Sequence, residues 1–179
     1  MLPDQSLSSI YQALLGLDIP SSISDSLALI EVPYVTFDNR EEKGQLVIHQ
    51  ELAEEVTALF EELYNQCFPI NKMVPLVEYG WDDVASMADN NTSAFNYRKI
   101  IATDLLSNHA LGRAIDINPL QNPYYALNGE VYPANAIHDP SVPGTLHRDS
   151  AAVFLFKEKG WTWLGDRDTY KDYQHFEKL

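Results

Sequence analysis

Two histidines and two aspartates, His109, Asp116, Asp172 and His175, form the set of side chains that a hydrolytic zinc site requires. A catalytic zinc ion usually takes three ligands from His, Asp or Glu and leaves a fourth position for water. A carboxylate close to that water can act as its general base. We therefore consider His109, Asp116 and His175 as candidate ligands and Asp172 as the candidate base, which favours an enzyme over a binding module.

The first half of this set lies around a glycine. Gly112 can turn the chain ahead of a strand in which Ala114 and Asp116 share one face. Such a turn brings His109 back over Asp116, and the small Ala114 leaves room for an ion beside them. The alternative is a surface or satisfied core histidine and a capping or turn aspartate, because single residues of both types are common.

The second half, Asp172-x-x-His175, lies among aromatic residues near the end of the sequence. Side chains three positions apart in an ideal strand point to opposite faces. If both serve one site, Asp172 must sit at the bend that enters the strand carrying His175. The alternative is a solvated aspartate beside a half-buried histidine on a terminal strand. Spacing alone does not decide between these readings, because both patterns are loose.

Five longer motifs carry more information, and they occur in this order: Asn90-Asn91-Thr92-Ser93-Ala94-Phe95-Asn96-Tyr97-Arg98, Ser107-x-His109-x-x-Gly112-x-Ala114-x-Asp116-Ile117-Asn118-Pro119, Asn122-Pro123-Tyr124, Gly160-Trp161-x-Trp163 and Asp172-Tyr173-Gln174-His175-Phe176-Glu177. Together they resemble the VanY-type zinc D,D-carboxypeptidase and peptidoglycan L,D-endopeptidase family. The resemblance runs from about Gly44 to the C-terminus. Its most specific part is the Ser-x-His-x-x-Gly-x-Ala-x-Asp block.

The resemblance implies a role for each matching residue. His109, Asp116 and His175 match the family's zinc ligands, and Asp172 matches its catalytic carboxylate. Arg98 matches the arginine that contacts the scissile carbonyl, and a guanidinium there can stabilise a developing oxyanion. The alternative for Arg98 is an ordinary surface ion pair.

Two further residues are candidates for substrate binding. Ser107 is expected to contact substrate or to orient His109, and its alternative is a simple turn residue. Trp163, with Trp161, fits either a wall of the cleft or the core, and we expect at least one of the two in the core.

The family further implies a zinc-dependent peptidase that hydrolyses peptide bonds next to D-amino acids in peptidoglycan or its precursors, with D-alanyl-D-alanine carboxypeptidase activity as the first expectation. The alternatives are a stem-peptide L,D-endopeptidase and a non-catalytic, zinc-containing cell-wall-binding module. Leu164 and Arg167 stand where many relatives continue the tryptophan block with glycines and a further tryptophan, so the shape of the substrate pocket is open.

Charge and hydropathy restrict the partners. The formal net charge of −14 repels phosphate backbones, which argues against nucleic acids and anionic membranes as partners. No run of residues approaches the roughly 20 apolar residues of a membrane span, and Met1–Ile10 lacks the pattern of a signal peptide. The substrate class implies the periplasm or cell wall. Cys67, the only cysteine, rules out an internal disulfide and is expected to be half-buried.

The elements that must position these residues are short. The clearest is a helix over 50–67, where Leu52, Val56, Leu59, Phe60 and Leu63 recur at helical spacing. We predict further helices over 6–17, 82–88 and 150–159. Strands are predicted over 29–37, 44–49, 71–79, 94–98, 113–117 and 173–177, and irregular connections over 118–150.

This order of elements predicts an α+β fold in a single domain, residues 1–179, with a small antiparallel sheet flanked by helices. We expect residues 1–43 to form an N-terminal packing segment and residues 44–179 the catalytic core. The family resemblance implies a hedgehog/D,D-peptidase-like fold with the zinc site at the sheet.

Overall fold

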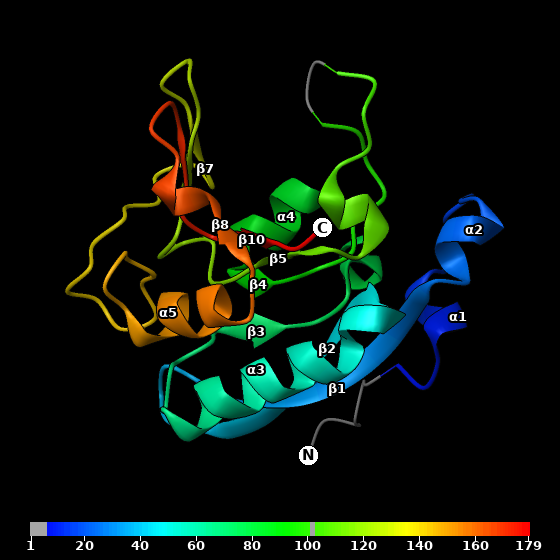
Figure 1. The fold of residues 1–179 in the computed structure, drawn as a ribbon, viewed down its shortest axis with the longest axis horizontal. Helices are drawn as coiled ribbons and strands as arrows, with labels where there is room; N and C mark the ends of the chain where they lie inside the picture. Colours follow the sequence, from blue (N-terminus) through cyan, green and yellow to red (C-terminus); the bar gives the residue numbers. More distant parts are fainter. Residues whose placement is uncertain (1–6, 101–102) are drawn as a thin grey trace.

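The structure, a computed structural model, describes residues 7–100 and 103–179. It combines helices with small, mostly antiparallel sheets, as the α+β prediction requires (Figure 1). Among these residues, no helix has the length and apolar character needed to cross a bilayer.

A long hairpin forms one side of the molecule. Strands β1 (Leu27–Val35) and β2 (Glu41–His49) pair antiparallel along their whole length. In β2, Leu46 and Ile48 face the main core, whereas Val47 faces a smaller cluster formed with α1 (Ile10–Ala13) and α2 (Ser21–Ser24). This alternation is the period of two expected for a strand that is buried on both faces.

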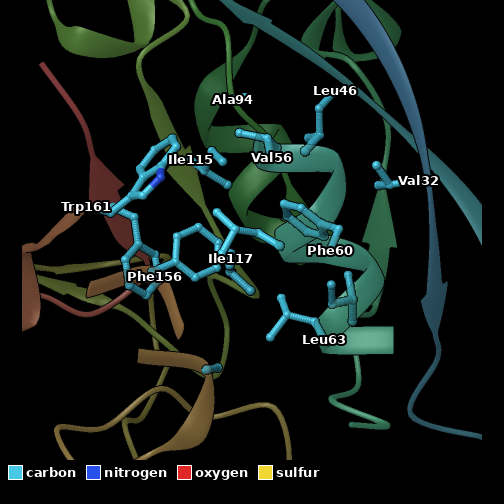
Figure 2. Close-up of a cluster of buried hydrophobic side chains, with 14 of the residues drawn as sticks. Val32, Leu46, Val56, Phe60, Leu63, Ala94, Ile115, Ile117, Phe156 and Trp161 are labelled. Carbon is cyan, nitrogen blue, oxygen red and sulfur yellow. The ribbon is translucent and has the colours of Figure 1, made fainter. Parts of the chain in front are cut away.

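Helix α3 (Ala53–Asn65) lies along this hairpin and is preceded by the 3-10 turn η1 (Gln50–Leu52) (Figure 1). The helix predicted over 50–67 is therefore present with narrower bounds, and its first three residues form η1 instead. Its apolar stripe, Val56, Leu59, Phe60 and Leu63, is fully buried. Figure 2 shows Val56, Phe60 and Leu63 pointing toward Ile115, Ile117 and Phe156, which come from the second half of the chain.

The second half builds two three-stranded sheets. One has the order β5 (Ala114–Asp116), β10 (His175–Glu177), β8 (Thr162–Trp163), and the other the order β7 (Val131–Tyr132), β6 (Tyr124–Tyr125), β9 (Lys171–Asp172). Helix α5 (Ala151–Glu158) covers the first sheet, and Phe156 stacks on Phe176 of β10 with ring centroids 4.2 Å apart. This packing fixes β10 against the core.

Smaller elements complete the chain. Strands β3 (Lys72–Met73) and β4 (Asn91–Thr92) pair parallel, and α4 (Asp83–Ala88) lies between them in the sequence. Three 3-10 turns are η2 (Leu76–Tyr79), η3 (Asn108–Leu111) and η4 (Leu164–Asp166).

Several sequence-based elements differ from the structure. The predicted strand 71–79 is wrong beyond β3, because the chain turns into η2 after Pro75. Residues 94–98, predicted as a strand, belong to no strand in the structure. The helix predicted over 6–17 is reduced to α1, and its first residue, Ser6, lies outside the described residues. The segment 118–150 contains the β6–β7 hairpin, and Cys67 is exposed rather than half-buried.

The predicted division between residues 43 and 44 stays a prediction. It falls inside β2, whose pairing with β1 joins residues on both sides of the division. The hedgehog-like fold implied by the family likewise stays a prediction, whereas the mixed architecture with small antiparallel sheets is confirmed.

Candidate metal centre

A tight turn carries the first ligand candidate. Ser107 caps η3, and its hydroxyl accepts a hydrogen bond from the His109 amide at 3.3 Å. Gly112 ends the turn with φ of 64°, a left-handed conformation that glycine adopts without strain. A Cβ at this position would lie 2.6 Å from the His49 amide nitrogen, so only glycine fits. The chain then enters β5, which ends at Asp116.

Strand register brings the other two candidates together. Strand β10 pairs antiparallel with β5, and this register places His175 directly opposite Asp116. Directly opposed residues of an antiparallel pair share one face of the sheet. The two side chains therefore meet although they are 59 positions apart in the sequence.

The three side chains form a compact, buried group. His109 Nε2 lies 3.2 Å from Asp116 Oδ2, and His175 Nδ1 lies 3.0 Å from Asp116 Oδ1. The two imidazole nitrogens are themselves 3.0 Å apart. One donor atom from each residue lies within 4.8 Å of the others, and the relative exposures of His109, Asp116 and His175 are 2%, 6% and 7%.

This donor set fits a divalent transition metal. Two imidazole nitrogens and one carboxylate oxygen are typical ligands of catalytic zinc, which leaves one coordination position for water. The outer nitrogen of His109, Nδ1, lies 2.5 Å from the Ala94 carbonyl oxygen. A carbonyl can only accept, so Nδ1 carries the proton and the lone pair of Nε2 faces the other donors.

The negative charge of Asp116 and the two imidazoles stabilise one another. Burial alone would raise the pKa of Asp116, but the two adjacent imidazoles outweigh it and hold the pKa of Asp116 far below its usual range. Burial alone would lower the pKa of His175, but hydrogen bonds to Asp116 and Glu177 raise it to about 10. Positive charge is thus strongly favoured at this position, whether as a proton or as a cation.

Asp172 lies next to this group at the end of β9. A bend separates Asp172 from His175, but it lies at Tyr173 and Gln174, so that Asp172 belongs to β9 and the strand predicted over 173–177 begins at His175. Asp172 Oδ1 is buried and has no hydrogen-bond partner among the described residues. Burial, together with the negative charge of Asp116, raises the pKa of Asp172 to about 7, although His175, His109 and Arg98 oppose the shift. A carboxylate with these properties is suited to exchanging protons near neutral pH.

Arg98 lies in the same region. It follows β4 in a segment without regular secondary structure, and its charge acts on Asp172. Its Nε lies 3.3 Å from Asp83 Oδ2 of α4, in an ion pair without hydrogen-bond geometry. The guanidinium is half-buried, so the structure combines the two sequence-based readings: Arg98 forms an ion pair and also lies near the candidate base.

The two substrate-binding candidates lie in different surroundings. Ser107 is buried and caps η3 by accepting from the His109 amide, a contact that agrees with both the orienting role and the turn residue considered for it; a contact with substrate stays a prediction. Trp163 is 3% exposed, and its indole N–H donates to the Tyr173 carbonyl at 2.8 Å. Trp161 and Trp163 both belong to the main core, and a contact between Trp163 and substrate stays a prediction.

Sequence reasoning missed two residues outside the group: Glu177 contacts His175, and Asn108 contacts Glu177. Glu177 Oε2 lies 3.2 Å from His175 Nε2 and accepts a hydrogen bond from Asn108 at 2.7 Å. A usable signal was present, because Glu177 follows His175 by two positions and residues at that spacing in a strand share a face. The neighbouring position of Asn108 depends on the fold and could not be read from spacing.

Comparison with known proteins relates the region of the candidate metal centre to a peptidase family. Residues 101–178 match the sequence model of the protein family described as D-alanyl-D-alanine carboxypeptidase. The match includes His109, Asp116, Asp172 and His175, and over residues 101–178 it confirms the resemblance to the VanY-type family. The part of the resemblance between Gly44 and Arg98 lies outside the match and stays a prediction. No curated protein and no solved structure is significantly similar to the chain.

Proposed function

We propose, from the family match over residues 101–178 and the buried His-Asp-His group within it, that the protein is a zinc-dependent peptidase. Its substrate on this proposal is a peptide bond next to a D-amino acid in peptidoglycan or its precursors, and its first activity is that of a D-alanyl-D-alanine carboxypeptidase. Such a substrate lies in the periplasm or cell wall. The observation that carries the proposal is the buried group of three ligand-type side chains beside an unpartnered carboxylate.

Each residue has a defined task in this proposal. His109, Asp116 and His175 would hold zinc, which when bound supplies Lewis acidity toward a scissile carbonyl and lowers the pKa of water. Asp172 takes the proton of the attacking water and later delivers it to the leaving amine. Arg98 stabilises the negative charge that develops on the carbonyl oxygen of the substrate.

The environment of Asp172 supports its role as the proton carrier. Its Oδ1 is free to accept a proton, because no described residue bonds to it. Arg98 is close enough to affect the pKa of Asp172, and its Nε has no hydrogen-bond partner among the residues described. Buried polar atoms without a hydrogen bond are costly. A bound water would supply a hydrogen bond to Asp172 Oδ1, and a bound substrate would supply one to Arg98 Nε, which otherwise has only the ion pair with Asp83.

Incubation with a muramyl pentapeptide ending in D-Ala-D-Ala tests the proposal. Zinc-loaded wild-type protein is expected to release a single alanine, detected by mass spectrometry. Asp172→Ala is expected to retain zinc and to lose about 10²-fold or more in rate, because it removes the general base. Full activity of Asp172→Ala would refute the assignment of the base, and cleavage within the stem would identify an L,D-endopeptidase instead.

The remaining alternative is a module that binds zinc without catalysis. A structural zinc site is usually closed by four protein ligands. X-ray absorption of the zinc-loaded protein distinguishes the two functions: three protein ligands and one exchangeable oxygen agree with a peptidase, and a fourth protein ligand would favour the non-catalytic module.

A further inference from the structure

One carboxylate oxygen connects the two segments that carry the histidine ligands. Glu177 Oε2 lies 3.2 Å from His175 Nε2 and accepts a hydrogen bond from Asn108 Nδ2 at 2.7 Å. Asn108 immediately precedes His109 in η3, and Glu177 lies in β10 with His175. The same atom therefore links two positions that are 69 residues apart in the sequence.

We infer that Glu177 is a positioning residue of the metal centre, which fixes the tautomer and the orientation of His175 and locks β10 to η3 through Asn108. This role depends on the metal site proposed above. Glu177 contacts the outer nitrogen of His175 and the side chain of Asn108, and it acts on the site through these two residues. It is thus distinct from the ligands and from the candidate base.

The geometry at His175 carries the inference. The Nδ1 atom of His175 faces Asp116 at 3.0 Å and His109 at 3.0 Å, so this is the nitrogen that would offer its lone pair to a metal held by the group. The proton must then reside on Nε2, and a carboxylate oxygen 3.2 Å away is an acceptor for it. Hydrogen bonding of this kind holds the imidazole ring and increases its basicity as a ligand.

The two ligands are held by different acceptors. The outer nitrogen of His109 is held by the main-chain carbonyl of Ala94, which no side-chain substitution removes. The outer nitrogen of His175 has a side chain as its acceptor, and that side chain is 18% exposed. Substitution of Glu177 therefore removes the support of one ligand and leaves the other intact.

The bridge to Asn108 has a second effect. The Nδ2 donor of Asn108 orients the carboxylate from the side of η3, so that Glu177 is held in place before any metal arrives. Both contacts use the same oxygen, Oε2. An uncharged amide oxygen at this position can accept both hydrogen bonds, whereas an alanine can accept neither.

Zinc affinity of the whole chain, measured by competition with a chromophoric chelator, tests the inference. Glu177→Ala is expected to weaken zinc binding by about 10–100-fold, the usual effect of removing an outer-shell partner. Glu177→Gln is expected to lose less than about tenfold, because its amide oxygen keeps the acceptor. Asn108→Ala should lie between wild type and Glu177→Ala, since the bond to His175 remains.

The control is Glu61→Ala, which removes an exposed carboxylate from α3 and should bind zinc like the wild type. Chemical unfolding of each metal-free variant shows which proteins are folded. If Glu177→Ala is unfolded without metal, Glu177→Gln and Asn108→Ala carry the test in its place.

Wild-type affinity in folded Glu177→Ala would overturn the inference, as would a loss in Glu177→Gln equal to that in Glu177→Ala. A wild-type protein that binds no zinc, or whose binding survives Asp116→Ala, would instead overturn the proposed function. The two failures are therefore distinguishable.

Discussion

The turn at Gly112 determines where His109 lies. Its φ of 64° and its contact with the His49 amide leave no space for a side chain. The Gly112 carbonyl also accepts a hydrogen bond from the His49 amide at 2.8 Å, which joins the turn to the end of β2. The position of the first ligand therefore depends on the long hairpin, although the hairpin supplies no ligand of its own.

Gly112→Ala is expected to destabilise the protein and to weaken zinc binding. The left-handed backbone alone costs about 1–2 kcal/mol for a residue with a Cβ. The overlap with the His49 amide nitrogen adds to that cost, because a backbone neighbour cannot move aside cheaply. Denaturant unfolding followed by circular dichroism measures the change in the free energy of unfolding.

Gly80→Ala is the matched control for this prediction. Gly80 has a similar φ of 59°, but a Cβ there would meet nothing within 4 Å. The Gly80→Ala variant should therefore lose only the stability that the left-handed backbone costs, and its zinc affinity should equal that of the wild type. Equal losses of stability in the two variants would contradict the steric explanation.

Among the elements, those with strong periodicity were predictable. Helix α3 and the β1–β2 hairpin have long apolar patterns, and the structure contains both close to their predicted bounds. A bend at Asp172 was expected if Asp172 and His175 serve one site, and the structure places it one residue later, at Tyr173 and Gln174. Segments 71–79 and 94–98 were assigned as strands because their residues favour extended structure. Their actual conformation depends on tertiary contacts that local propensity does not encode.

The candidate site was predictable for a different reason. Its residues follow a motif, so their identities could be read from the sequence, but their distances could not. The approach of His175 to Asp116 requires the register of β5 and β10, which pair across 59 residues of sequence. The contacts of Glu177 with Asn108 and of Arg98 with Asp83 likewise arise only in the folded chain.

Helix α3 is joined to the residue after β10 by a partly buried ion pair. Both oxygens of Glu55 accept hydrogen bonds from Lys178 at 2.8 Å, and the indole of Trp161 donates to Glu55 at 2.8 Å. Burial alone would raise the pKa of Glu55, but these donors outweigh it and lower the pKa below 4.5. The pair holds the far end of the ligand-bearing strand against the helix.

Glu55→Gln is expected to lower the free energy of unfolding by about 1 kcal/mol at pH 7, because Lys178 loses its charged partner. The loss stays small because the pair is partly exposed to solvent. Because the pKa of Glu55 is lowered in the folded state, ionised Glu55 stabilises the folded protein at pH values above 4.5. This stabilisation disappears as the pH falls through the pKa of Glu55 in the folded protein. The difference between wild type and variant should therefore shrink below pH 4.5.

Unfolding curves across a pH series measure this difference, with Glu54→Gln as the control. Glu54 is exposed on the same helix. A difference between wild type and Glu55→Gln that stays constant as the pH falls would show that the ion pair does not contribute to stability.

In the molecule as a whole, β5 and β10 contribute side chains both to the main core and to the candidate site. The core cluster extends from Val32 in β1 to Phe176 in β10, so the hairpin, α3, α5 and the ligand-bearing sheet pack together. Ile115 lies in β5 beside Asp116, and Phe176 lies in β10 beside His175. A metal ion bound by these two strands therefore binds the folded protein and not the unfolded chain.

Metal removal is expected to lower the thermal stability of the whole protein. A ligand that binds only the folded state at about 100 times its dissociation constant raises the free energy of unfolding by about 2.7 kcal/mol. Zinc-loaded wild-type protein should therefore unfold at a lower temperature after addition of a chelator, as measured by calorimetry. In Asp116→Asn, addition of the chelator should change the unfolding temperature much less. A change equal to that of the wild type would show that the stabilising metal binds at another site.

The separation of the two histidines along the chain also sets the order of events during folding. His109 and His175 lie 66 positions apart, so closing the loop between them costs entropy before any contact compensates for it. The β1–β2 hairpin and α3 use neighbours in sequence and can form earlier. A chain in which only these elements have formed offers a cation no binding site. Metal should therefore slow the unfolding reaction and leave the folding rate almost unchanged.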